Sequence, residues 1–125
     1  MVTETKYTTD ETWLSVDGDT GTIGITDYAQ QQLNDLVFVK LPTVGQRVTK
    51  GEEAASVESV KAASDIHAPV TGEVLEVNQA IVADPALVNS DPMGAGWFFK
   101  VRIEQKNELA DLMDDSQYRE YAKKQ

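Results

Sequence analysis

The pattern of apolar and polar positions predicts a chain built mainly from short β-strands. Residues 12–16 and 22–25, the second with isoleucine at alternate positions, flank the turn residues Asp17-Gly18-Asp19 and predict a hairpin. Further along, Trp, Phe, Val and Ile alternate with Lys and Arg over 97–103, which predicts a half-buried strand. The continuous apolar run over 36–39 predicts a buried strand.

A second hairpin is predicted near the centre of the chain, where residues 57–60 and 66–70 are β-type runs joined by small and polar residues. Its tip, at about 59–64, is expected to hold Lys61 in water. A lysine in such a position presents a compact ammonium group on a four-carbon stem and is accessible to acylation by another enzyme. The alternative is an ordinary solvated surface lysine.

Helical signals are short and lie at the margins of this β-rich pattern. A helix is predicted over 28–33, where Thr26 or Asp27 can act as the N-cap. Residues 84–89 predict one helical turn with proline at its first position. C-terminal helices are expected over about 107–122.

A weak internal repeat relates residues 44–48 to residues 70–74, on either side of the central hairpin. Two short halves related in this way would form two small antiparallel sheets that face each other across one core. We therefore expect one mainly β domain over residues 1–125. Its predicted architecture is a barrel-sandwich hybrid of two sheets, with short peripheral helices and a C-terminal helical segment.

The composition narrows the classes of partner. A hydrophobic content of 41% in 125 residues is typical of one globular domain, and no apolar run is long enough to span a bilayer, so no membrane partner is expected. The net charge of −10 disfavours nucleic acid and favours encounters with basic protein surfaces. The first residues resemble neither a signal peptide nor a transit peptide, so we expect a cytoplasmic protein or one already processed.

Side-chain combinations typical of enzymes are not found in the sequence. There is no cysteine, so the single histidine, His67, lacks a partner for a Cys/His metal site or a catalytic pair, and a structural role is expected for it. Asp10, Glu11, Asp17 and Asp19 are expected to be solvated turn carboxylates. The pattern therefore favours a protein on which other enzymes act.

The segment Glu58-Ser59-Val60-Lys61-Ala62-Ala63-Ser64-Asp65 resembles the lipoylation motif of the glycine cleavage system H-protein family. The resemblance extends from about Tyr7 to Tyr121, in family order and with family spacing. It includes the blocks 24–30, 37–39, 41–42, 68–74, 87–89, 91–92 and 96–97. Blocks distributed across the whole chain make the resemblance highly specific.

This resemblance implies a lipoyl-domain-like fold and a carrier function rather than an enzymatic one. In the family, lipoate is attached to the lysine that matches Lys61, and the amide-linked arm is neutral and flexible. The arm takes the aminomethyl group of glycine from a pyridoxal-phosphate-dependent glycine decarboxylase to a tetrahydrofolate-dependent aminomethyltransferase, and dihydrolipoamide dehydrogenase reoxidises its dithiol with FAD and NAD. A lipoate ligase or a lipoyl/octanoyl transferase would attach the group. The expected location is the cytoplasm for a bacterial protein and the mitochondrial matrix for a processed eukaryotic one.

Polar residues on both sides of Lys61 are candidates for recognition by the lipoylating enzyme or for contacts with the arm. They are Glu58, Ser59, Ser64 and Asp65. The alternative is that these residues simply keep the tip solvated.

One departure from the family concerns the cleft that shelters the loaded arm. The family usually has His-Glu before the first tryptophan, and that glutamate helps to hold the arm, whereas Glu11-Thr12 precede Trp13 here. A shifted Glu11 is the available substitute for the missing carboxylate. We expect the loaded carrier to lose ammonia faster than a Thr12→Glu variant, and equal rates would contradict this expectation.

Other carriers share some of these features. A biotin carrier domain normally has methionines beside its lysine, where Val60 and Ala62 stand here, and a lipoyl domain of a 2-oxoacid dehydrogenase normally has aspartate immediately before the lysine. Two further alternatives keep the fold but change the function: a carrier that relays or donates lipoyl groups to other proteins, and an unmodified scaffold that binds partners. Acylation of Lys61 and a neighbouring gene for glycine decarboxylase would discriminate between them.

Overall fold

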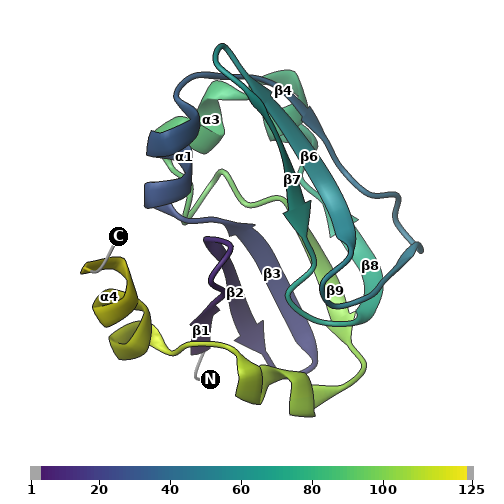
Figure 1. The fold of residues 1–125 in the computed structure, drawn as a ribbon. Helices are drawn as coiled ribbons and strands as arrows, with labels where there is room; N and C mark the ends of the chain where they lie inside the picture. Colours follow the sequence, from purple (N-terminus) through teal and green to yellow (C-terminus); the bar gives the residue numbers. More distant parts are fainter. Residues whose placement is uncertain (1–3, 124–125) are drawn as a thin grey trace.

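The computed structural model describes residues 4–123 and contains nine strands and several short helices within that range (Figure 1). The strands are β1 (Glu4–Tyr7), β2 (Thr12–Asp17), β3 (Thr20–Ile25), β4 (Leu36–Lys40), β5 (Arg47–Val48), β6 (Glu53–Ser59), β7 (Ala63–His67), β8 (Gly72–Val77) and β9 (Phe99–Ile103). The helices are α1 (Asp27–Leu33), α2 (Gln79–Ala83), α3 (Ala86–Ser90) and α4 (Asp115–Lys123), with a 3₁₀ helix, η1 (Lys106–Asp111). No helix of this part of the chain is long and apolar enough to cross a membrane.

The strands form two antiparallel sheets of unequal size. The larger sheet has the order β1-β2-β3-β9-β8-β5, and the smaller one has the order β4-β6-β7. The two predicted hairpins are confirmed as β2–β3 and β6–β7. The mainly β architecture with two antiparallel sheets and peripheral helices is also confirmed, although the sheets form a sandwich and do not close into a barrel.

The two segments of the internal repeat lie side by side in the larger sheet. β5 pairs antiparallel with β8, and the register places Val48 opposite Gly72. The amide of Gly45 donates to the carbonyl oxygen of Val74 at 2.8 Å. The amide of Val74 in turn donates to the carbonyl oxygen of Gln46, also at 2.8 Å. The repeat therefore does not divide the molecule into two equivalent halves. After the β6–β7 hairpin the chain returns to the larger sheet as β8, which pairs with the edge strand β5.

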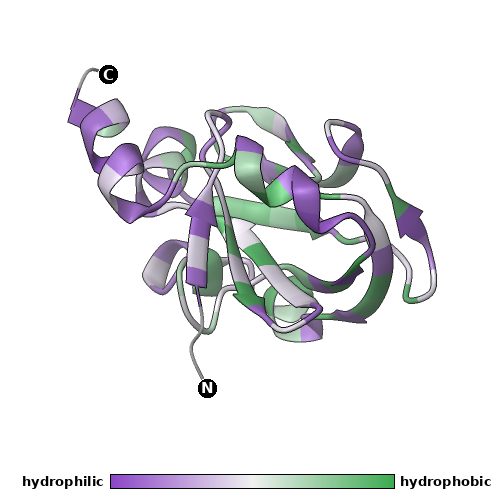
Figure 2. Cartoon of the chain, turned by 90° about the horizontal axis from the view of Figure 1, so that it is seen from below, coloured by the Kyte–Doolittle hydropathy of each residue, from purple (hydrophilic) through white to green (hydrophobic). Residues whose placement is uncertain are grey.

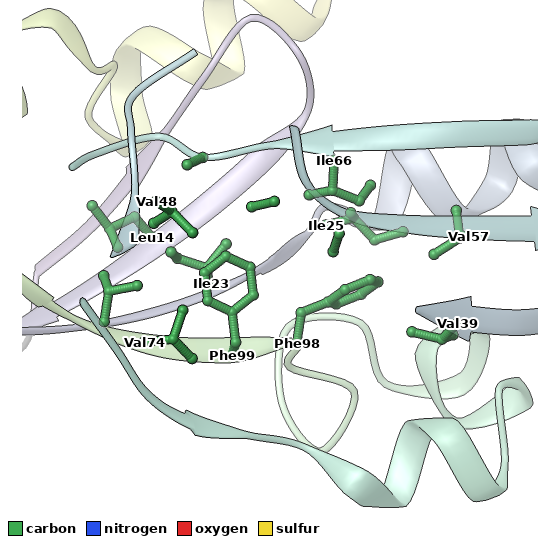
Figure 3. Packing of buried hydrophobic residues seen from close by; sticks show 14 of the residues in the cluster. Leu14, Ile23, Ile25, Val39, Val48, Val57, Ile66, Val74, Phe98 and Phe99 are labelled. Atoms are coloured by element: carbon green, nitrogen blue, oxygen red, sulfur yellow. The ribbon is translucent and has the colours of Figure 1, made fainter. Parts of the chain in front are cut away.

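The core lies between the two sheets and takes side chains from both (Figure 3). Phe98 and Phe99 are fully buried, together with Ile23 and Val74 of the larger sheet and Val57 of the smaller one. Burial of an aliphatic or aromatic side chain of this size stabilises a fold by about 1.5–3 kcal/mol. This shared core fixes the β6–β7 hairpin relative to the larger sheet.

The strand over Leu36–Lys40 differs from its prediction. β4 is an edge strand, and only Leu36 and Val39 of its four apolar side chains are buried. Val37 and Phe38 are 56% and 50% exposed. The prediction of a fully buried strand was wrong because an apolar run does not reveal a β-bulge, and the register of β4 with β6 shifts between Leu36 and Phe38.

The C-terminal segment is partly as predicted. The first expected helix is the 3₁₀ helix η1, and the second is α4. Asp114 caps α4: its carboxylate accepts from the amide of Gln117 at 2.8 Å, and the Gln117 side chain accepts from the amide of Asp114 at 3.0 Å. α4 carries no buried residue, and the ribbon of this helix in Figure 2 is coloured as mostly hydrophilic residues. It lies against β1 through stacked rings of Tyr7 and Tyr118, whose centroids are 4.4 Å apart.

β1 and α2 have sequence signals too weak for prediction. β1 is a four-residue strand with only Tyr7 buried, and α2 is a five-residue helix with only Ile81 buried. A single buried side chain gives no periodicity, so tertiary packing rather than local pattern establishes these elements.

Candidate functional site

The turn between β6 and β7 is closed by the side chain and backbone of Ser59. The amide of Ser59 donates to the carbonyl oxygen of Ala62 at 2.7 Å, and its hydroxyl donates to the same oxygen at 3.1 Å. The Ser59 hydroxyl oxygen also accepts from the amides of Lys61 and Ala62 at 3.1 and 3.0 Å. These bonds hold the four-residue turn 59–62 in one conformation, as expected for a serine that replaces backbone partners in a tight turn.

A second layer of contacts braces the turn against the loop that follows α1. The amide of Val60 donates to the carbonyl oxygen of Asp35 at 3.0 Å. That loop is in turn held by Asn89 of α3, whose side chain accepts from the amide of Leu36 at 2.9 Å and donates to the carbonyl oxygen of Asn34 at 2.8 Å. In Figure 1 the tip of the β6–β7 hairpin stands at the top, above α1 and α3.

Lys61 is exposed on this braced turn. Its Nζ lies 3.4 Å from the carbonyl oxygen of Gln32, near the C-terminus of α1. A bond of that length is weak, so it does not prevent another molecule from reaching the amine. Lys61 therefore combines a fixed backbone with an accessible amine.

A groove of about 190 Å³ lies between α1 and β7; we call it the α1–β7 groove. Gln32, whose carbonyl oxygen lies 3.4 Å from Nζ of Lys61, is one of its lining residues, so the groove lies next to the amine end of the Lys61 side chain. The groove has apolar and polar walls, and its lining residues are Asp10, Glu11, Ile25, Tyr28, Ala29, Gln32, Leu33, Ser64, Asp65 and Ile66.

Glu11 contributes a buried carboxylate to this groove. The residue is only 9% exposed, and its backbone has a φ of 63°, a left-handed conformation that residues other than glycine rarely adopt. Its Oε1 accepts hydrogen bonds from the hydroxyls of Thr26, at 2.8 Å, and Tyr118. Its Oε2 is buried and has no hydrogen-bond partner among residues 4–123. The prediction that Glu11 is a solvated turn carboxylate was therefore wrong.

The environment of Glu11 also changes the acidity of its tyrosine partner. Burial and the hydrogen bond to Glu11 raise the pKa of Tyr118 to about 12. Burial and the nearby carboxylate of Asp115 likewise raise the pKa of Tyr7. Both phenols therefore stay protonated to a higher pH than an ordinary tyrosine, and both donate hydrogen bonds to neighbouring carboxylates.

The structure separates the predicted site residues into two groups. Ser64 and Asp65 line the α1–β7 groove together with Glu11. Glu58 and Ser59 instead border a shallow hollow beside Lys61, which has a volume of about 290 Å³.

Thr12 belongs to neither group. It is only 2% exposed, and it is not among the residues that line either the groove or the hollow. His67, for which a structural role was expected, lies on β7 with its Nδ1 4.0 Å from Oδ2 of Asp10.

Comparison with known proteins agrees with this arrangement. The sequence model of the family described as Glycine cleavage H-protein matches residues 5–125. The chain belongs to this family. Members are carrier components of the glycine cleavage system rather than enzymes, and they carry lipoate. Membership decides against the biotin carrier and 2-oxoacid dehydrogenase alternatives.

Two curated relatives of the family cover nearly the whole chain. A glycine cleavage system H protein of Bradyrhizobium diazoefficiens is 59% identical over 118 residues, which are 94% of this chain and 97% of the relative. One of Beijerinckia indica subsp. indica is 54% identical over 119 residues, with 95% and 96% coverage. The crystal structure of a glycine cleavage system H protein from Mycobacterium marinum superposes with a TM-score of 0.88 at 39% identity, covering 98% of this chain and 99% of that one.

Three residues support the site through contacts that the sequence did not predict. Tyr118 gave no signal as a partner of Glu11, because the two residues are 107 positions apart. Asn89 lies in a block that resembles the family, but its hydrogen bonds to the loop after α1 depend on the packing of α3. Thr26 was recognised as a helix cap and does accept from the amide of Ala29, yet its second bond to Glu11 was not foreseen.

Proposed function

We propose that Lys61 is the lipoyl attachment site and that this chain is the lipoyl carrier of a glycine cleavage system. The observation that carries the proposal is the exposed amine of Lys61 on a turn held by Ser59 and Asp35, next to the α1–β7 groove. A rigid base gives the arm a defined origin, while rotation within the arm lets its end visit several active sites. Tethering also keeps the carried group at high effective concentration near a docked partner.

The residues around the α1–β7 groove fit such an arm. Ile25, Leu33 and Ile66 offer apolar surface to a hydrocarbon chain. Glu11 offers a buried oxygen that lacks a partner among the described residues, and a cationic group at the end of the arm would supply that partner. We assign to Glu11, Ser64 and Asp65 the task of holding the loaded arm against the protein.

Recognition by the lipoylating enzyme is assigned to Glu58 and the turn around Ser59. Thr12 is buried and does not line the groove, so of the two candidates for the arm cleft only Glu11 contributes a side chain to it.

The finer function that we propose is the one that membership of the family suggests. Attached to Lys61, a lipoyl group would supply a dithiolane able to accept the aminomethyl group at glycine decarboxylase, to give up its one-carbon unit at the tetrahydrofolate-dependent aminomethyltransferase and to be reoxidised by dihydrolipoamide dehydrogenase. A lipoate ligase or a lipoyl/octanoyl transferase is the partner that attaches it. The two curated relatives are bacterial, which favours the cytoplasmic alternative over the mitochondrial one.

Intact mass spectrometry after expression with lipoate and a lipoate ligase tests the proposal. We expect one lipoyl increment on the wild-type chain and none on Lys61→Ala. Lys40→Ala, which removes another exposed lysine of the smaller sheet, is the matched control and should keep the increment. An increment retained by Lys61→Ala would move the attachment site, and no increment on the wild-type chain would favour an unmodified scaffold.

A further inference from the structure

An exposed apolar patch lies beside Lys61, and its side chains take no part in holding the arm as proposed above. It consists of Val37 and Phe38 on β4 and Val60 in the turn, which are 56%, 50% and 69% exposed; we call it the tip patch. Val37 and Val60 border the same hollow of about 290 Å³ as Lys61. Isolated exposed apolar residues are ordinary, but apolar residues gathered around one reactive side chain indicate a contact surface.

The β-bulge in β4 creates this patch. Regular alternation would turn only one of two successive side chains outward. The register shift between Leu36 and Phe38 leaves both Val37 and Phe38 outward, while Leu36 and Val39 remain buried. Edge strands are commonly protected by charged side chains, so two adjacent apolar residues on this edge are a liability unless a partner covers them.

We infer that the tip patch is the surface by which the enzyme that acylates Lys61 recognises this chain; the inference rests on the proposed function. The unmodified amine stands at the end of a side chain of only four methylene groups, so an active site that receives it must also contact the neighbouring Val60. Once the arm is attached, its far end can enter other active sites without burial of the turn. The geometry therefore connects the tip patch with the acylation step in particular.

The charges around the patch indicate the chemistry of the enzyme surface. Glu58 and Asp35 are exposed beside it, and the whole chain has a net charge of −10. Glu58 pairs with Phe38 across β4 and β6, which places its carboxylate on the face of the patch. A complementary surface is apolar at its centre and has Lys and Arg at its rim.

The inference is tested by the kinetics with which a ligase acylates the full-length chain, starting from the unmodified protein. The probe is a lipoate ligase with ATP and lipoate: the Lys61 nitrogen forms an amide with the carboxyl carbon of lipoyl adenylate, the bond to AMP breaks, and protons of the ammonium pass to solvent. Val37→Ser and Val60→Ser are compared with Val44→Ser, which removes a valine of the same 56% exposure as Val37 but away from the turn. Glu58→Gln tests the charged rim.

We expect Val37→Ser and Val60→Ser each to raise the KM for the carrier about tenfold, which corresponds to about 1.4 kcal/mol, with kcat and the urea midpoint unchanged. Val44→Ser should keep the wild-type KM, and Glu58→Gln should raise KM mainly at low salt. Wild-type KM values in both tip variants would overturn the inference while leaving the proposed function intact. Failure of the wild-type chain to accept lipoate at Lys61 would instead overturn the proposed function, and the inference with it.

A second readout separates acylation from later steps. Variants that have been lipoylated to completion with excess ligase are reduced by dihydrolipoamide dehydrogenase and NADH. We expect wild-type KM values in this reaction. An equally large rise in KM here would make the tip patch a general docking surface and overturn its assignment to the acylating enzyme.

Discussion

The amide of Val60 donates a hydrogen bond to the carbonyl oxygen of Asp35 at 3.0 Å, and this bond joins the tip of the β6–β7 hairpin to the loop that follows α1. A two-stranded hairpin tip that projects alone is free to fray. Here Asp35 is itself held through Asn34 and Leu36, which flank it and both bond to Asn89. The position of Lys61 is therefore set by contacts from three separate parts of the chain.

Asn89→Ala should destabilise the protein by about 1–3 kcal/mol, because it leaves the amide of Leu36 and the carbonyl of Asn34 without their side-chain partner. The free energy of urea unfolding measures this effect. Asn107→Ala, which removes an exposed asparagine, is the matched control and should change stability by less than about 0.5 kcal/mol. Equal stability of Asn89→Ala and wild type would show that the loop does not need this brace.

Glu11→Gln should increase the rate at which the free loaded carrier loses ammonia. The amide keeps an acceptor for Thr26 and Tyr118 but removes the charge that would pair with the ammonium group of the arm. Asp10→Asn removes an exposed carboxylate of the same groove and should have a much smaller effect. Ammonia release is measured by a coupled assay, and identical rates for Glu11→Gln and wild type would dismiss a role for Glu11. Because Thr12 is buried and outside the groove lining, Glu11→Gln is a sharper test than Thr12→Glu.

The stability of the protein should fall as the pH rises from about 10 to about 12. The pKa of Tyr118 is raised to about 12 by burial and by the hydrogen bond to Glu11, against 10.0 for an ordinary tyrosine. The folded state thus keeps a proton that the unfolded state has lost, so this contribution is complete below pH 10 and disappears toward pH 12. Tyr118→Phe should show a shallower decline in urea unfolding across that range, with Tyr121→Phe on the same helix as control. A decline as steep as that of wild type would exclude Tyr118 as its source.

Gly72→Ala should be among the most destabilising small substitutions. A Cβ at this position would collide with the carbonyl oxygen of Arg102 on the neighbouring β9, and backbone cannot move aside without breaking the sheet. We expect a loss of about 3 kcal/mol or more. Gly21→Ala would meet the end of the Leu14 side chain, which can change rotamer, so its loss should be smaller. The order of the two urea midpoints checks this prediction, and a reversed order would contradict it.

The sequence by itself determined the parts of this protein that depend on neighbouring residues. Alternation predicted the β2–β3 hairpin and β9, and the small residues after Lys61 predicted the turn that exposes its amine. The family blocks along the chain are enough to identify the family, because their order and spacing are properties of the sequence alone.

Only the tertiary structure decided which side chains surround that amine. It buried the carboxylate of Glu11 under Tyr118, turned Val37 and Phe38 outward through a bulge, and brought Asn89 to the loop after α1. The physical reason is that the periodicity of hydrophobic residues along the sequence indicates which face of one element is buried. Contacts between elements that are distant in sequence depend instead on how those elements pack. The sequence around a turn carboxylate is the same whether that carboxylate is hydrated or accepts a hydrogen bond from a tyrosine near the far end of the chain.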